Sequence, residues 1–150
     1  MLELNLPPFQ IRSKTVESKT CLWDRLRKKY VVLTPEEWVR QHFINYLIEY
    51  KSYPEALIAN EIQISLNSTK KRCDSVVYNS RLMPLVIVEY KAPDVKITQE
   101  VFNQIIRYNM VLKVCYLIVS NGIDHYCCKI DYEKQTSQYL NDIPDYSVLL

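Results

Sequence analysis

The stretch that decides the fold runs from Lys70 to Pro93 and reads KKRCDSVVYNSRLMPLVIVEYKAP. It predicts two strands, Cys73–Tyr78 and Pro84–Lys91, joined by a turn at Asn79–Met83. Four apolar residues in a row, Leu85–Val88, are typical of a strand that is covered on both faces. The pattern therefore indicates a strand in the interior of a sheet, preceded by its hairpin partner.

The second of these strands ends in Glu89-Tyr90-Lys91, so that charges follow directly on an apolar run. Side chains alternate along a strand, which puts Glu89 and Lys91 on one face, about 7 Å apart. Desolvating such charges is costly unless they are paired or used. If the two strands pair as a hairpin, Asp74 can lie beside Glu89. Two carboxylates would offer Mg²⁺ hard oxygen ligands, and the lysine could orient a water for attack on a phosphodiester.

Upstream of the hairpin the sequence predicts one helix and one strand. Thr34-Pro35-Glu36-Glu37 has the residues of a helix start, with Thr34 as the cap and Glu37 completing a capping box. The helix should run to about Tyr50. From Leu57 to Leu66 the apolar period changes to two, which predicts a half-buried strand with its apolar residues on one face, namely Ile58, Ile62, Ile64 and Leu66.

Downstream, Thr98 opens a second helix that should reach about Leu112. Its predicted apolar stripe consists of Val101, Ile105, Tyr108 and Leu112. Two more strands are expected at Val114–Val119 and Asp124–Tyr132, whereas residues 133–150 show no clear pattern. The order of helix, three strands, helix and two strands predicts an α/β fold, an α/β/α sandwich around a central mixed sheet of about five strands.

The length and composition are those of one soluble globular domain. The chain has 150 residues, of which 48% are hydrophobic and 24% charged. Residues 1–33 are interpreted as an N-terminal arm, poorly ordered over the first twenty residues and with a short strand at Tyr30–Leu33. Residues 34–150 are the expected domain. No apolar run approaches the roughly 20 residues of a membrane span.

Scarce residue types exclude several functional classes. The single glycine, Gly122, rules out the glycine-rich phosphate loops of motors and dinucleotide enzymes. Two histidines cannot form an HExxH zinc site, and the five cysteines contain no CxxC pair. An odd cysteine count without a visible signal peptide indicates reduced thiols and a cytoplasmic setting. Cys115 and Cys127 lie in strand-like runs and are expected to be buried.

Two pairs of helical residues accompany the charged strand end. Glu36 and Arg40 are four residues apart and share a helix face, as do Gln104 and Tyr108. Each feature has an ordinary explanation when taken alone. Glu36 would complement the helix dipole, the second pair would be a plain helix flank, and the strand end would be solvated surface. Their occurrence around one hairpin favours a shared site.

Three segments resemble the N-terminal nuclease domain of type I restriction enzyme R subunits, a branch of the PD-(D/E)xK nuclease superfamily. They are TPEEWVRQ at residues 34–41, the hairpin at residues 70–93 and QIIRY at residues 104–108. The resemblance covers about Thr34 to Tyr132. It implies a restriction-endonuclease-like fold and a phosphodiesterase site that depends on Mg²⁺ and accepts Mn²⁺ in its place.

The same resemblance assigns residues to family motifs. Asp74 matches the motif aspartate, and Glu89 with Lys91 matches the E-x-K pair. Cys73 replaces the proline that names the superfamily. The helical motifs are then matched by Gln104 and Tyr108 (the Q-x-x-x-Y element of the RecB-like branch) and by Glu36 with Arg40 (E-x-x-x-R), with Glu37 as the alternative carboxylate.

These inferences lead to the hypothesis of a Mg²⁺-dependent deoxyribonuclease. Asp74, Glu89 and the Tyr90 carbonyl would bind the metal, and Lys91 would position the attacking water. DNA is the expected partner, and the missing phosphate-binding loop implies that a separate motor or specificity protein would supply translocation. Two rival hypotheses remain open: a catalytically silent DNA- or protein-binding module of the same fold, and a structural domain without a nucleic-acid role.

Overall fold

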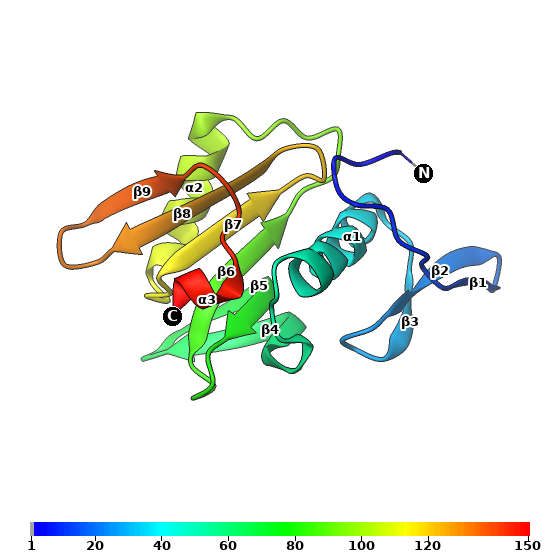
Figure 1. The fold of residues 1–150 in the computed structure, drawn as a ribbon, viewed down its shortest axis with the longest axis horizontal. Coiled ribbons are helices and arrows are strands. Elements are labelled where there is room, and N and C mark those ends of the chain that lie inside the picture. The colour runs from blue at the N-terminus through cyan, green and yellow to red at the C-terminus, as the bar shows by residue number, and fades with distance from the viewer. Residues whose placement is uncertain (1) are drawn as a thin grey trace.

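The computed structural model describes residues 2–150, which form two separate sheets (Figure 1). The smaller sheet is antiparallel and has the strand order β1-β2-β3. Its strands are β1 (Ser13–Val16), β2 (Lys19–Asp24) and β3 (Lys29–Val32). The larger sheet has the order β4-β5-β6-β7-β8-β9, with β4 (Ile58–Leu66), β5 (Thr69–Tyr78), β6 (Pro84–Tyr90), β7 (Tyr116–Ser120), β8 (His125–Asp131) and β9 (Thr136–Leu140).

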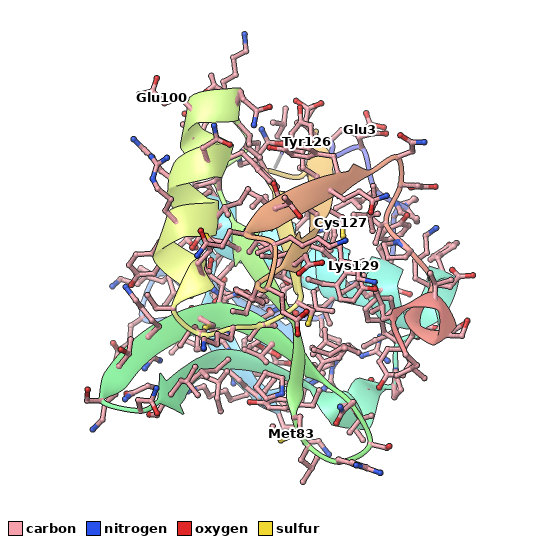
Figure 2. The ribbon with its side chains drawn as sticks, turned by 90° about the vertical axis from the view of Figure 1, so that its left-hand side faces the viewer. Glu3, Met83, Glu100, Tyr126, Cys127 and Lys129 are labelled. Carbon is pink, nitrogen blue, oxygen red and sulfur yellow. The ribbon has the colours of Figure 1, made fainter. Side chains whose placement is uncertain are left out.

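Helices cover both faces of the larger sheet, which confirms the predicted α/β/α sandwich. They are α1 (Pro35–Tyr50), α2 (Gln99–Met110) and the short α3 (Tyr146–Leu149), with a single 3₁₀ turn at Glu55–Leu57. Seen after a 90° turn (Figure 2), α2, with Glu100 in its first turn, stands on one side of the sheet and α1 on the other. Two buried apolar clusters result, one under α1 and α3 and one under α2.

The sheet is mixed because only β6 and β7 run parallel, joined by the crossover through α2. Every other neighbouring pair is antiparallel. Alternation along β6 sends Val86, Val88 and Tyr90 to the α1 side and Ile87 to the α2 side. The run that was predicted to be covered on both faces is indeed covered on both. The sixth strand, β9, lies in the segment that showed no clear pattern.

The predicted helix start at Thr34 is confirmed, but the capping box is only half formed. Thr34 Oγ1 accepts a hydrogen bond of 3.1 Å from the backbone N–H of Glu37. The Glu37 carboxylate does not complete the box and instead contacts Arg27 and Arg40. The Glu37 side chain therefore forms ion pairs with these two arginines in place of a hydrogen bond to the helix end.

Strand β4 does not keep its apolar residues on one face, so that prediction is wrong. Ile58 packs in the cluster under α1, whereas Ile62 and Ile64 pack in the cluster under α2. The cause is Glu61, which has a φ of 53°. One residue in the left-handed region shifts the alternation of side chains, and the strand changes face at that point.

The buried stripe of α2 also differs from the predicted one. The helix faces the sheet through Phe102, Ile105, Ile106 and Asn109. Tyr108, which was predicted to be part of the apolar stripe, is 49% exposed. The helix is rotated so that Tyr108 stands at the edge of the contact, where it is available to a site.

The N-terminal segment is a folded sheet rather than a poorly ordered arm, although the strand expected at residues 30–33 is present as β3. The sequence showed no period there because all four residues of β1 are exposed. The ladder is supported by cation–π contacts, with Arg12 Cζ 4.3 Å from the ring centre of Trp23 and Lys14 Nζ 4.2 Å from that of Tyr30.

The five cysteines are all free thiols. Cys127 is buried as expected, but Cys115 is exposed because β7 begins only at the next residue. No helix between residues 2 and 150 is both long enough and apolar enough to cross a membrane.

Candidate active site at the β5–β6 fork

The predicted hairpin opens into a fork where its two candidate metal-binding carboxylates lie. Strands β5 and β6 pair at Val77 with Val86, at Val76 with Ile87 and at Ser75 with Val88. The next opposed positions would be Asp74 and Glu89. At that point Asp74 Oδ2 accepts a hydrogen bond of 2.9 Å from the backbone N–H of Tyr90. A hydrogen bond from the β6 backbone to the Asp74 side chain of β5 therefore replaces the next backbone–backbone hydrogen bond between the two strands.

The end of β6 beyond the fork is held from the β7 side. Glu89 pairs with Val119 and Tyr90 with Ser120 in parallel register. The backbone N–H of Lys91 donates to the Ser120 carbonyl over 2.9 Å. Glu89, Tyr90 and Lys91 are thus fixed by β7 while Asp74 approaches from β5.

The ionised forms of both carboxylates of the fork are destabilised in the absence of a cation, so their pKa values are raised. Burial raises the pKa of Asp74, opposed in part by the Tyr90 N–H and by the nearby Arg40. Burial also raises the pKa of Glu89; Lys91 opposes this rise, and the charge of Asp74 adds to it. Lys91 Nζ lies 3.8 Å from Glu89 Oε2, with both side chains part-exposed. Net negative charge therefore remains in a partly desolvated place.

Helix α2 supplies the wall that faces this fork. An open cavity of about 300 Å³ is lined by Glu89, Gln104, Ile105 and Tyr108. The predicted Q-x-x-x-Y pair is thus brought to the same place as the carboxylate of the E-x-K pair. Lys71 of β5 contacts Tyr108, with its Nζ 3.4 Å from the centre of the Tyr108 ring.

The structure does not bring Glu36 to this site. Glu36 is exposed and forms no ion pair with any residue between 2 and 150, including Arg40. Its neighbour Glu37, the alternative left open by the sequence, lies 3.3 Å from Arg40 and 2.6 Å from Arg27. Arg40 is 4% exposed, and its charge acts on Asp74. The geometry therefore favours Glu37 as the carboxylate linked to the site.

Sequence reasoning missed Glu61 as a neighbour of the site. It accepts hydrogen bonds from Arg40 over 2.6 Å and from Arg72 over 2.9 Å. Although burial acts in the opposite direction, these two guanidinium groups hold the pKa of Glu61 below its usual value. The available signal was Asn60-Glu61, two consecutive polar residues that interrupt the alternation of apolar and polar residues along this strand.

The donor set fits a hard cation bound with few protein ligands. Residues 2–150 contain no cluster of three or more His, Cys, Asp or Glu side chains suited to a metal. Two carboxylates and a backbone carbonyl, from Asp74, Glu89 and Tyr90, match the way Mg²⁺ is held in many enzymes, with water completing its shell. The raised pKa of both carboxylates is the effect that a bound cation would relieve.

The different surroundings of Glu37 and Glu36 lead to a prediction about stability. Glu37→Ala should lower the free energy of unfolding by about 2 kcal/mol, since it leaves the buried Arg40 with one partner fewer. Glu36→Ala is the matched control on the same helical turn and should change it by less than about 0.5 kcal/mol. Urea unfolding of the two variants measures the difference, and equal losses would contradict the assignment.

The fold and the fork define a restriction-endonuclease-like α/β/α domain with an acidic strand end. A model of the family described as type I restriction enzyme R protein N terminus (HSDR_N) matches residues 35–144. The chain belongs to this family. The match begins at the first residue of α1 and includes the fork, the Q-x-x-x-Y pair and all six strands of the larger sheet.

A comparison with solved structures agrees with the family. A fragment assigned as an HsdR subunit of a type I restriction enzyme from Vibrio vulnificus YJ016 matches with a TM-score of 0.56 and 20% sequence identity. The match covers 78% of this chain and 24% of that one, so the present chain spans about a quarter of its length. At this identity the likeness concerns the fold. No curated protein matches the chain.

Proposed function

We propose that this domain is a Mg²⁺-dependent nuclease that hydrolyses phosphodiester bonds of DNA. The observation that carries the proposal is the fork, where Asp74 from the middle of β5 lies beside Glu89 and Lys91 at the end of β6. A structural domain without a nucleic-acid role leaves this arrangement unexplained, because partly buried carboxylates with raised pKa values cost stability. Membership of the restriction-subunit family supports the same proposal.

The roles of the protein groups follow from their positions. Asp74, Glu89 and the Tyr90 carbonyl would hold Mg²⁺, which when bound supplies Lewis-acid polarisation of the phosphate. Lys91, part-exposed and 3.8 Å from Glu89, would orient the attacking water and stabilise charge that develops on the phosphate. Gln104 and Tyr108 would position the nucleic acid across the cavity they line. Glu37 would act through Arg40 rather than on the metal.

The setting of the activity is inferred from the family. DNA is the proposed partner, together with a motor or specificity protein, since the single glycine of these 150 residues cannot build a phosphate-binding loop. Translocation would therefore come from outside this segment. Five free thiols agree with a cytoplasmic setting.

Cleavage assays with the purified protein test the proposal. Linear duplex, closed circular and single-stranded DNA should be incubated with Mg²⁺, with Mn²⁺ and with EDTA. Metal-dependent cleavage is expected, and loss of the closed circle would show endonuclease rather than exonuclease action. Retention of DNA in a gel-shift assay without cleavage under any metal would instead support the silent binding module.

A prediction about Gln104 tests the role of α2. Gln104→Ala should weaken cleavage by about tenfold, because a positioning group is lost. It should leave the melting temperature nearly unchanged, because the side chain is exposed and outside the apolar stripe of the helix. Asn103→Ala, one residue earlier and also exposed, is the control that should keep both properties. Activity that falls only in step with stability would make Gln104 structural.

A further inference from the structure

A continuous chain of buried hydrogen bonds connects the small N-terminal sheet with the fork. Tyr90 Oη donates to Ser75 Oγ over 2.9 Å, and Ser75 Oγ donates to Asn60 Oδ1 over 2.6 Å. Asn60 Nδ2 then donates to Asp24 Oδ2 over 3.0 Å. Each of the four residues is at most 7% exposed, and they come from β6, β5, β4 and β2 in turn.

Every bond in this chain points the same way, toward the carboxylate of Asp24. That carboxylate is fully buried and also accepts from the backbone N–H groups of Leu26 and Arg27 and from the Arg27 guanidinium. Burial alone would raise the pKa of Asp24, but these donors and Asn60 hold it below its usual value. An ionised acceptor at one end fixes the orientation of the Asn60 amide, and through it the hydroxyl rotors of Ser75 and Tyr90.

The hydrogen-bond chain ends at Tyr90, next to the point where the backbone pairing between β5 and β6 stops. The paired positions of the two strands end at Ser75 and Val88, and beyond them Tyr90 makes two hydrogen bonds to β5. Its backbone N–H binds Asp74, and its hydroxyl binds Ser75. The two bonds pin the same residue to β5 from its main chain and from its side chain. They therefore set how far Asp74 and the end of β6 can separate.

Asp24, the acceptor at the far end of the hydrogen-bond chain, lies outside the region that the family model matches. Asp24 is the last residue of β2, whereas the family model matches residues 35–144. Apolar residues of similar size would fill the positions of Asn60 and Ser75 without any need for partners, and unpaired polar groups there would be costly. Polar residues at both positions, fully bonded and in one direction, indicate a geometric role.

We propose that Asp24, Asn60 and Ser75 are positioning residues that hold Tyr90 and thereby set the spacing of the metal ligands at the fork. The small N-terminal sheet then contributes to the geometry of the site, because its residue Asp24 is the charged acceptor at the end of the hydrogen-bond chain. This inference rests on the proposed Mg²⁺ site and adds to it the residues that keep its geometry.

The test compares two tyrosines that each lose one buried hydroxyl bond. Tyr90→Phe removes the bond to Ser75 and keeps the backbone groups of the fork. Tyr53→Phe is the control, since Tyr53 is 2% exposed and donates to the Pro144 carbonyl over 3.0 Å, away from the chain. The readout is the Mg²⁺ concentration at half of the metal-induced rise in melting temperature, which needs no substrate.

Tyr90→Phe is expected to raise this Mg²⁺ midpoint about tenfold, the usual effect of losing an outer partner of a metal ligand. Tyr53→Phe should leave the midpoint unchanged even though both variants melt at a lower temperature than the wild type. Ser75→Ala, which keeps the Tyr90 hydroxyl, is the second variant and should move the midpoint in the same direction. In cleavage assays the same variants should need more Mg²⁺ while nearly recovering the wild-type rate at saturation.

A double variant tests whether Asp24 acts through the chain. Asp24→Asn alone should raise the Mg²⁺ midpoint, and the Asp24→Asn/Tyr90→Phe double variant should raise it no further than the larger of the single effects. Multiplying effects, or an unchanged midpoint in Tyr90→Phe and Ser75→Ala while the wild type responds to Mg²⁺, would overturn the positioning role and leave the proposed function in place. A wild type that shows no Mg²⁺ response at all would overturn both.

Discussion

Lys91→Ala is expected to reduce the cleavage rate by on the order of 10²–10³-fold while the fold and the Mg²⁺ response persist. Lysine carries a point charge and donates hydrogen bonds but does not ligate Mg²⁺, so its loss removes charge stabilisation and water positioning without removing a metal ligand. The side chain is 36% exposed and its nearest carboxylate oxygen is 3.8 Å away, so little packing is lost with it.

Single-turnover cleavage measures the expected loss of rate, and thermal melts of the same preparation with and without Mg²⁺ measure whether the fold and the metal response persist. Lys96→Ala is the matched control, because Lys96 is an exposed lysine five residues further along the chain. Cleavage at the wild-type rate by well-folded Lys91→Ala protein would contradict the assigned mechanism. Loss of activity in both variants would show a general need for positive charge rather than a specific role of Lys91.

Asp74→Asn is expected to do two opposite things: raise the stability of the metal-free protein and abolish its response to Mg²⁺. The substitution removes one of two mutually repelling charges at the fork. The amide oxygen can still accept the bond from the Tyr90 N–H that Asp74 accepts in the wild type. A packing defect would instead lower the stability of the metal-free protein, so the sign of the change separates the two explanations.

The Mg²⁺ response of the wild type has a definite expected size. With a dissociation constant of about 1 mM, 10 mM Mg²⁺ stabilises the folded state by about 1.4 kcal/mol. For a chain of this length that corresponds to roughly 3–6 °C in melting temperature. Asp142→Asn, at an exposed carboxylate, is the control that should keep the response. If the wild type shows no metal shift and Asp74→Asn is simply less stable, Asp74 is structural.

The stability gain of Asp74→Asn should also depend on pH. The folded pKa of Asp74 is raised above its ordinary value of 3.8, so the folded protein binds the proton more tightly than the unfolded chain. Wild-type stability therefore falls as the pH rises from 3.8 through the folded pKa, and the variant lacks this loss. The difference between the two proteins should be largest near neutral pH and shrink as the pH is lowered, as measured by urea unfolding at several pH values.

Several features of the fold could be predicted from short stretches of sequence. Thr34 and Thr98 cap helices because a side-chain oxygen three residues from an N–H is a local arrangement. The apolar run before Glu89 becomes the doubly covered strand because alternation along a strand is local too. The grouping of Asp74 with Glu89 needed only the hairpin that the turn at residues 79–83 allows.

The features that could not be predicted depend on single backbone angles or on distant partners. Glu61 takes a φ of 53° and moves the rest of β4 to the other face, and the composition of the strand carries no sign of that angle. Glu36 and Glu37 are neighbours on one helical turn, and only the positions of Arg27 and Arg40 in the folded protein show that Glu37 forms ion pairs with both.

The sequence by itself determined the sandwich, five of the six strands of its larger sheet and the charged strand end, because periodicity and capping are properties of neighbouring residues. Only the tertiary structure decided that the first 33 residues contain a sheet and that Asp24 is bonded, 36 positions away, to Asn60. The reason is physical: a buried polar group is satisfied by whatever donor the folded chain brings within about 3 Å, and that donor need not be near in sequence.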